Sequence, residues 1–431
     1  MGFGLAALNR LAGSPLLDRT GLRKPVENVV ATATRQGFRV AGAAQRTFKA
    51  TTRLGKPARL APVPETGLFD LTPNDEQQMI VETVSEFAAK QLRPAAAEAD
   101  DTMTPPDGLL GRAAELGLTV VGIPEELGGI GSERSTVTNV LVAEALAHGD
   151  LGLAVAVLAP SAVSNVLVRH GDAHQQATYL PAFTGEDVPA AALALQERAP
   201  LFDVFAPKTT AKRTPNGYRL NGVKNLVPRA AQAELFIVSA NLEGRGPALF
   251  VVESSSKGVS IEAEPAMGLR GAATGKLVLE GVSLPASALI GGGKRDVFTD
   301  VVRSSRLAWS ALACGTAKAV LDYVIPYVNE REAFGEPISH RQGVAFQVAD
   351  IGIELEGMRL VMLRAASRAE QDKPHAREVA LARKLAVDKG MWIGSTGVQL
   401  LGGHGFIKEH PVERWYRDLR AIGVMEGVVT A

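Results

Sequence analysis

The chain has 431 residues, of which 46% are hydrophobic and 21% charged, so it can form two or three packed units with conventional cores. Lysine plus arginine equals aspartate plus glutamate, which gives a formal net charge of zero. This balance hides an asymmetry, because residues 1–60 carry eleven basic side chains and only two acidic ones. Beyond this basic head, no feature of the sequence indicates nucleic-acid binding.

Cysteine and histidine usage excludes several kinds of site. Cys314 is the only cysteine, which rules out an internal disulfide framework and a zinc site built from several thiolates. The seven histidines show no spacing typical of metal ligands, so we expect no metal. We also expect no membrane span, since no run of about eighteen uncharged apolar residues stands out.

Residues 1–68 are predicted to form a basic N-terminal extension and linker that ends among prolines. Three interpretations remain open for it. In the first interpretation it is a transit peptide, which would place the protein in the mitochondrial matrix. In the second interpretation it is an amphipathic arm, through which residues 1–60 contact an anionic membrane surface or another subunit. In the third interpretation it is a solvated, partly disordered tail of a cytoplasmic protein. The composition resembles a transit peptide and fits an arm equally well, but we place the solvated tail ahead as the simplest interpretation.

Residues 69–185 are predicted to form an N-terminal α-helical domain. Thr72 is expected to cap a helix whose first residue is Pro73. Apolar residues at helical spacing predict further helices over 109–116, 136–147 and 151–168.

A central β domain is predicted over residues 186–292. Pro215–Gly217 is a hairpin signal between the β-type runs Val204–Arg213 and Tyr218–Leu220. Four more short β-type runs follow, at 235–240, 248–252, 259–263 and 277–279.

Helices return in residues 293–431, where long Ala- and Leu-rich segments over 307–328, 344–371 and 377–401 predict a C-terminal four-helix bundle. The fold class is therefore α+β and mainly α.

The end of the chain carries the residues best suited to chemistry. Gln399–Phe406 contains glycines that let backbone approach a ligand, and Glu413–Asp418 is a charged cluster. After them comes Glu426, with only Gly, Val, Met and Ile in the four positions before it. A carboxylate in apolar surroundings becomes a usable base near neutral pH. We therefore predict that Glu426 is a catalytic base, although a glutamate near a C-terminus is more often a surface residue.

Several motifs, taken in order from about residue 70 to the end, resemble the acyl-CoA dehydrogenase family. They are Pro124–Gly129, Tyr218–Lys224, Met267–Gly271, Gly281–Pro285, Arg331–Ile338 with Gln342, Phe346, Ala349 and Asp350, Gln399–Phe406, and Glu413–Asp418. Their order and spacing carry the resemblance more than any single motif does. It implies a helical domain, a β-barrel or sandwich domain and a helical bundle, with FAD as the cofactor.

The resemblance also implies roles for individual residues. Glu426 matches the base that takes the α-proton of a fatty acyl-CoA while a β-hydride goes to flavin N5, and Arg306 matches an arginine of the substrate pocket. Cofactor-binding positions are Arg331, Phe334 and Gln342, which hold the FAD diphosphate and adenine across a subunit interface, and Gln196, Gln399, Gly402 and Gly403. The implied partners are acyl-CoA, an electron-transfer flavoprotein or similar acceptor, and further copies of the chain in a dimer or tetramer.

Without the resemblance, simpler interpretations hold for some of these residues. Arg331 reads as a helix-end charge paired with Glu332 or Glu336, Arg306 as a charge near a helix start, and Gly402–Gly403 as an ordinary turn. Ser305 sharpens the assignment of Glu426, because some family members carry the base at this position and serine cannot serve as one.

The sequence departs from the family pattern in the β domain and beyond the base. Phe202 and Pro228 stand where hydroxyl groups approach the cofactor, Leu226 replaces an indole that packs on the flavin, and Val428 replaces a threonine. Two interpretations follow. One is an active acyl-CoA dehydrogenase with a rearranged flavin site. The other is a catalytically degenerate subunit that partners a paralogue or binds acyl-CoA without turnover. An oxygen-using relative is a third possibility.

Overall fold

The computed structural model describes residues 71–120, 122–129, 135–185 and 187–431, which belong to one compact unit, Phe69–Ala431. The predictions for the basic extension at residues 1–68 lie outside the described residues.

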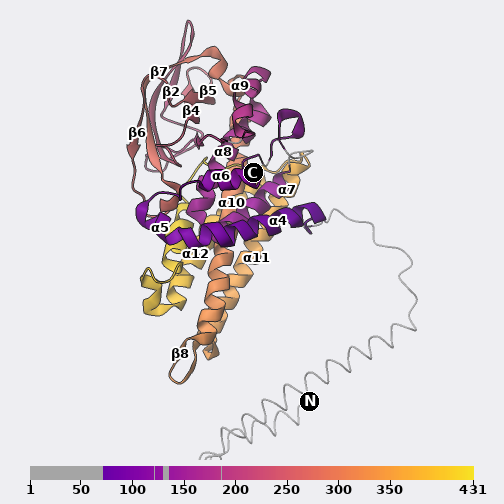
Figure 1. Cartoon of the computed structure of the whole chain (residues 1–431), viewed down its shortest axis with the longest axis vertical. Coiled ribbons are helices and arrows are strands. Elements are labelled where there is room, and N and C mark those ends of the chain that lie inside the picture. The colour runs from indigo at the N-terminus through magenta and orange to yellow at the C-terminus, as the bar shows by residue number, and fades with distance from the viewer. Residues whose placement is uncertain (1–70, 121, 130–134, 186) are drawn as a thin grey trace, which may run out of the picture. The chain divides into compact units, whose positions relative to one another are not determined.

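Helices form the N-terminal part of the described chain (Figure 1). They are α4 (Asp75–Phe87), α5 (Arg93–Thr102), α6 (Leu109–Glu115), α7 (Thr136–Gly149), α8 (Leu151–His170) and α9 (Ala173–Phe183). The predicted cap at Thr72 is wrong, because α4 is capped by Asn74. Its side chain accepts a hydrogen bond from the Gln77 amide, and the Gln77 side chain accepts one from the Asn74 amide.

Helix α8 is uncharged over Leu151–Val168 and almost wholly buried. Among the described residues, α8 and α10 (Arg295–Glu330) are long and apolar enough to cross a membrane by length and composition. The sequence-based statement that no such stretch exists is therefore wrong. Because 89% of the apolar window of α8 is buried inside the protein, burial in a core accounts for its composition.

A curled sheet follows, built from seven strands in the order β1-β4-β2-β3-β7-β6, with β5 pairing to the free side of β4. The strands are β1 (Ala191–Ala194), β2 (Thr210–Thr214), β3 (Gly217–Val227), β4 (Leu235–Leu242), β5 (Gly246–Glu253), β6 (Val259–Ala263) and β7 (Gly275–Pro285). The predicted hairpin joins β2 to β3, but residues 204–209 are not strand. Strand β1 pairs with β4 in parallel, so that its other edge is available to the C-terminal segment.

Four helices form the predicted C-terminal bundle: α10, α11 (Gln342–Glu370), α12 (Ala376–Leu400) and α13 (Val412–Ala421). The first three match the long segments predicted from composition, and α13 contains the charged cluster Glu413–Asp418. A small hairpin of β8 (Glu332–Ala333) and β9 (Glu336–Pro337) joins α10 to α11. In Figure 1 this hairpin lies at the end of the bundle far from the sheet. Helix α10 has 36 residues, and at 1.5 Å per residue it is roughly 54 Å long.

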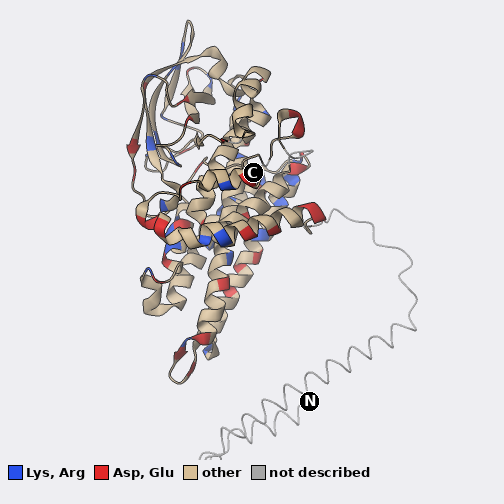
Figure 2. Cartoon of the chain, viewed as in Figure 1, with Lys and Arg blue, Asp and Glu red and all other residues tan. Residues whose placement is uncertain are grey.

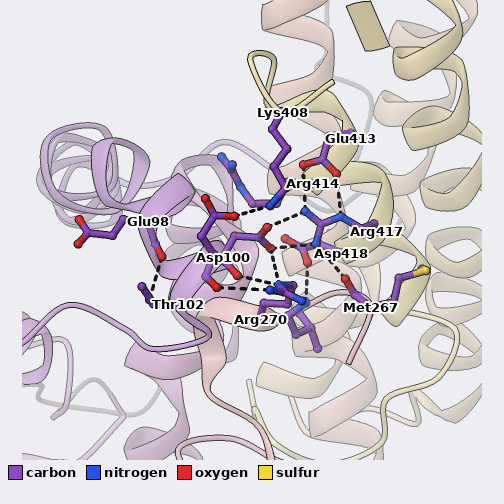
Figure 3. A network of polar contacts seen from close by, with 12 residues as sticks. Glu98, Asp100, Thr102, Met267, Arg270, Lys408, Glu413, Arg414, Arg417 and Asp418 are labelled. Carbon is purple, nitrogen blue, oxygen red and sulfur yellow. Dashed lines mark hydrogen bonds and ion pairs between the residues drawn. The ribbon is translucent and has the colours of Figure 1, made fainter. Parts of the chain in front are cut away.

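One buried ionic network joins helix α5, the loop before β7 and helix α13 (Figure 3). The Arg417 guanidinium donates to both Asp100 oxygens at 2.9 and 2.8 Å, to Glu413 and to the Met267 carbonyl at 2.8 Å. Asp418 accepts from the Leu269 amide at 2.6 Å. Figure 2 shows acidic and basic segments side by side around α5, where this network lies. It ties together three parts of the chain that are far apart in sequence.

The carboxyl group of Asp418 lies in surroundings that disfavour its negative charge. Burial, together with the nearby carboxylate of Asp150, raises the pKa of Asp418 to about 7. Asp150 is itself buried, caps α8 through the Leu153 amide and pairs with Arg414 at 3.1 Å. Burial also raises the pKa of Asp150.

Candidate active site around Glu426

Glu426 lies in a short segment that leaves α13 and docks on the edge of β1. The Val428 amide donates to the Leu193 carbonyl at 3.1 Å, and Gly427 forms an isolated antiparallel bridge with Ala194. Strand β1 thus positions the backbone on both sides of Glu426.

Helix α10 holds the same segment from the other side. The Ser305 hydroxyl and the Trp309 indole N–H both donate to the Gly427 carbonyl at 2.8 Å, and both side chains are fully buried. Because they are four residues apart, they lie on one face of α10. Sequence reasoning treated Ser305 only as a residue that cannot be a base, and it missed this anchoring role.

The Glu426 carboxylate meets the Arg306 guanidinium in a bidentate ion pair. Arg306 Nε lies 3.1 Å from both carboxylate oxygens, and Nη2 lies 2.7 Å from Oε1. The Glu426 side chain is 13% exposed and that of Arg306 is 30% exposed. The Arg306 guanidinium also stacks on the Phe205 ring at 5.7 Å. The purely apolar environment expected for Glu426 is therefore wrong, since its carboxylate contacts a guanidinium.

Arg383, on α12, is a second cation near this segment that sequence reasoning did not identify. Its Nη2 donates to the Met425 carbonyl at 2.6 Å, while its Nη1 is buried without a partner. Burial lowers the pKa of Arg383, and the charge of Glu426 opposes this effect. No pattern of spacing marks this residue, because its contact depends on how α12 packs against the turn after α13.

A cavity of about 410 Å³ opens next to this segment. Its lining includes Val424, two residues before Glu426, and it faces β-domain residues Gln196, Arg198, Leu226 and Glu264. Gln196 is buried, and its Oε1 atom has no hydrogen-bond partner. A buried acceptor without a partner indicates a place for a ligand donor. The structure thus brings Gln196 and the Glu426 segment to one cavity.

Two loops of the β domain are fastened to each other beside the cavity. The Asn225 side chain accepts from the Arg198 amide at 2.8 Å and donates to Glu264 at 2.6 Å, and Glu264 also accepts from the Leu226 amide at 2.7 Å. The backbone at Arg198 and Leu226 is therefore held in place by side-chain contacts.

A buried ion pair lies under these loops. Lys224 Nζ is 2.6 Å from Glu197 Oε1 and 2.8 Å from the Ser239 hydroxyl. Burial lowers the pKa of Lys224 to about 8, against the attraction of Glu197. The pKa of Glu197 is also lowered: burial raises it, but Lys224 and the Thr209 amide outweigh that effect. At neutral pH both groups are therefore charged, and the pair is neutral as a whole.

The four departures from the family pattern have distinct structural settings. Phe202 packs against an apolar cluster of the β domain, and Pro228 is buried. Leu226 and Val428 both have positive φ, of 52° and 75°. Such angles are costly for bulky side chains and tend to occur at functional sites.

The residues predicted to bind the FAD diphosphate lie far from this cavity in the same chain. Arg331, Phe334 and Gln342 are all exposed, on the β8–β9 hairpin and the start of α11. Arg331 does not pair with Glu336, which instead contacts His340 and Arg341. Arg306 and Arg331 are separated by 25 positions along α10 and its end, or roughly 38 Å. A single chain therefore does not bring Arg331 to Glu426.

Gln399, Gly402 and Gly403 are likewise exposed, at the end of α12 and in the turn that follows. A side chain added to either glycine would meet no atom within 4 Å, so there is open space beside this backbone. Among the described residues, the Gln399 carbonyl accepts from the Leu401 amide at the end of α12.

Comparison with known proteins places the whole described chain in one family. Profiles for the N-terminal, middle and C-terminal domains of acyl-CoA dehydrogenases match residues 74–187, 192–282 and 295–429. The rat mitochondrial short/branched chain specific acyl-CoA dehydrogenase is 32% identical over 361 residues, covering 82% of this chain and 83% of its own.

Two solved structures are also similar. Butyryl-CoA dehydrogenase from Megasphaera elsdenii has a TM-score of 0.77 and 28% identity, covering 83% of this chain and 96% of its own. The FAD complex of PigA has a TM-score of 0.77 and 25% identity, with the same coverage.

Proposed function

We propose that this chain, which belongs to the acyl-CoA dehydrogenase family, removes hydrogen from the α and β carbons of a fatty acyl-CoA thioester, with Glu426 as the base. Members of the family are FAD-dependent oxidoreductases, so the enzyme class and the cofactor predicted from the sequence are confirmed. The two named dehydrogenases favour an enzyme over a catalytically degenerate subunit.

The observation that carries this proposal is the position of Glu426. The carboxylate is anchored from β1 and α10, held by Arg306, and two residues from a wall of the cavity. The cavity fits a flavin ring because it offers the unpartnered Gln196 Oε1 to a ring N–H and apolar contacts from Leu226 and Val424. Bound FAD supplies the acceptor for the β-hydride.

Arg306 donates to both oxygens of the Glu426 carboxylate and so fixes its orientation. The ion pair is partly exposed, and its bidentate form uses both carboxylate oxygens. We propose that substrate binding turns one oxygen away from Arg306 and toward the α-carbon. Arg306 would then stay on the other oxygen and line the substrate pocket.

We also propose that the enzyme is a homo-oligomer in which Arg331, Phe334 and Gln342 of one chain bind the FAD of another. The separation of roughly 38 Å along α10 prevents these residues from serving their own Glu426. A second copy is supported by an exposed apolar stripe on α11, where Phe346, Ile353 and Leu360 recur every seven residues.

Electron-transfer flavoprotein or a similar acceptor is the proposed oxidant, as the family implies. The depth of the substrate pocket determines which acyl chain lengths fit, and a series of acyl-CoAs measures this preference.

The base is tested with purified protein loaded with FAD and mixed with acyl-CoAs of increasing length without oxygen. We expect the flavin absorbance to bleach, and we expect Glu426→Gln to bind FAD but to bleach at least about a hundredfold more slowly. Glu409→Gln, which alters an exposed glutamate outside the site, is the control. Normal bleaching in Glu426→Gln would place the base elsewhere, and protein that never binds FAD would refute the enzyme.

The oligomer is tested by measuring mass in solution. Ile353→Glu should shift the protein toward monomer and weaken FAD binding, because a buried charge breaks the apolar stripe. Met79→Glu, at an exposed apolar residue of α4, is the control. A wild-type protein that is monomeric and still binds FAD tightly would contradict this arrangement.

A further inference from the structure

The cavity beside Glu426 continues into a second cavity of about 430 Å³ on the β domain. Glu197, Arg198 and Asn225 line both, so the two spaces meet at these residues. The result is one groove that begins beside Val424 and ends between Lys208 and Lys276.

The charges of this groove are unbalanced where the two cavities meet. Glu197 is neutralised by Lys224, and Lys276 pairs with Glu262 at 3.2 Å. Among the described residues, the side chains of Arg198 and Lys208 have no ion pair or hydrogen bond, and both are exposed. Glu264 is the one further carboxylate in the lining.

The backbone of Arg198 is fixed although its side chain is free. Its amide donates to Asn225, whose own amide donates to the Gln196 carbonyl at 3.0 Å. The guanidinium therefore extends from an ordered loop, which reduces the entropy lost when it binds a ligand.

A buried polar atom without a hydrogen-bond partner lies in the half of the groove near Glu426. It is Gln196 Oε1, on a residue that is 8% exposed. Such atoms are rare in native proteins and indicate a ligand or solvent partner. Arg198, which lines both halves, extends the binding surface away from the reacting end.

We propose that Arg198 and Lys208 bind the diphosphate of a nucleotide ligand whose other end occupies the cavity beside Glu426. A guanidinium is well suited to phosphate oxygens, which it contacts with paired N–H donors. FAD and acyl-CoA both carry a diphosphate, and either can supply it. This inference rests on the proposed function, because it assumes that the cavity beside Glu426 holds the reacting end.

The experiment compares wild type, Arg198→Gln and Arg198→Gln/Lys208→Gln. Flavin-free full-length protein is titrated with FAD, FMN and riboflavin, and FAD-loaded protein with an acyl-CoA and the matching acyl-pantetheine. Arg219→Gln is the control, because Arg219 is an exposed arginine of β3 that lines neither cavity.

If the diphosphate belongs to FAD, Arg198→Gln weakens FAD binding about tenfold or more and leaves riboflavin binding unchanged. If it belongs to CoA, the same loss appears for acyl-CoA but not for acyl-pantetheine. The loss should shrink at high salt, where wild-type binding weakens too. Either pattern supports the proposal.

Equal affinities of wild type and the double variant for FAD and acyl-CoA would overturn it. So would a loss that is the same for riboflavin and acyl-pantetheine, which carry no diphosphate. Wild-type protein that binds neither FAD nor acyl-CoA would instead refute the proposed function, so the two failures are distinguishable.

Discussion

Gly427 determines where Glu426 points. It has a φ of +80°, a region that side chains with a Cβ rarely adopt. A Cβ at this position would lie 2.7 and 2.9 Å from side-chain atoms of Leu195, closer than atoms pack. The glycine is therefore needed both for its backbone angle and for the close approach to β1.

Gly427→Ala should lower activity and stability together. We expect the unfolding free energy to fall by about 1–3 kcal/mol, since alanine is strained at this angle and collides with Leu195. Turnover should drop because the Glu426 carboxylate moves off Arg306. Gly244→Ala is the control, since Gly244 has a φ of +77° but open space around it. Thermal unfolding and steady-state kinetics are measured for both variants. Gly244→Ala shows the effect of backbone strain alone, and any additional loss in Gly427→Ala comes from the contact with Leu195. Equal losses of stability in the two variants would show that the contact with Leu195 is unimportant.

Helix α10 supplies three side-chain contacts to the segment that carries Glu426, from Ser305, Arg306 and Trp309. Ser305 and Trp309 hold the Gly427 carbonyl, and Arg306 holds the Glu426 carboxylate between them. A single helix thus contacts both the backbone after Glu426, the proposed base, and its side chain.

The double variant Ser305→Ala/Trp309→Phe should reduce kcat/KM about tenfold or more and leave FAD affinity nearly unchanged. It removes both side-chain donors to the buried Gly427 carbonyl and leaves only the Val429 amide at 2.9 Å, and each lost hydrogen bond contributes about 0.5–1.5 kcal/mol. Either single variant should have a smaller effect because one donor remains. Ser310→Ala is the control, since the Ser310 hydroxyl bonds only to its own helix, at the Arg306 carbonyl. Unchanged kinetics in the double variant would show that β1 alone positions Glu426.

At the element scale, the sequence predicted the long helices and most strands, because their periodicity is set by burial within a few turns. It missed β1, which is only four residues long, and it misplaced the first cap by two positions. In the site, Glu426 and Arg306 were identified separately, but their ion pair was not. That contact spans 120 positions, and local patterns carry no information about it.

Arg383 and the groove at Arg198 illustrate the same limit. Arg383 acts through a carbonyl on another element, which no side-chain pattern encodes. Arg198 follows Gln196, a predicted cofactor-binding residue, but no motif in the sequence marks Arg198 itself. Its neighbour Glu197 pairs with Lys224 and accepts from the Lys208 amide, and these contacts depend on the tertiary structure.

The ionic network at α5 and α13 makes the stability of the whole molecule depend on pH. Asp418 has a pKa of about 7 in the folded protein, above the ordinary 3.8, so the folded state binds its proton more tightly. Its stabilising contribution is fully present below about pH 3.8 and is lost as the pH rises through 7.

Asp418→Asn should remove this dependence. Relative to the variant, the wild type should lose roughly 1 kcal/mol of unfolding free energy between pH 6 and pH 8, because one pKa unit corresponds to about 1.4 kcal/mol. Denaturant unfolding at several pH values measures the difference. Asp107→Asn, at an exposed aspartate, is the control. Parallel curves for wild type and Asp418→Asn would mean that Asp418 does not titrate in this range.

The length of α10 determines which mutant alleles of the gene can complement each other. It separates the anchor of the base from the hairpin that carries Arg331, so a complete site would draw on two chains. An allele that lacks Glu426 and another that lacks Arg331 would each be inactive alone. In a cell that expresses both, mixed dimers would contain one chain with an intact base facing one with an intact Arg331. Two null alleles of this gene should therefore complement each other partially.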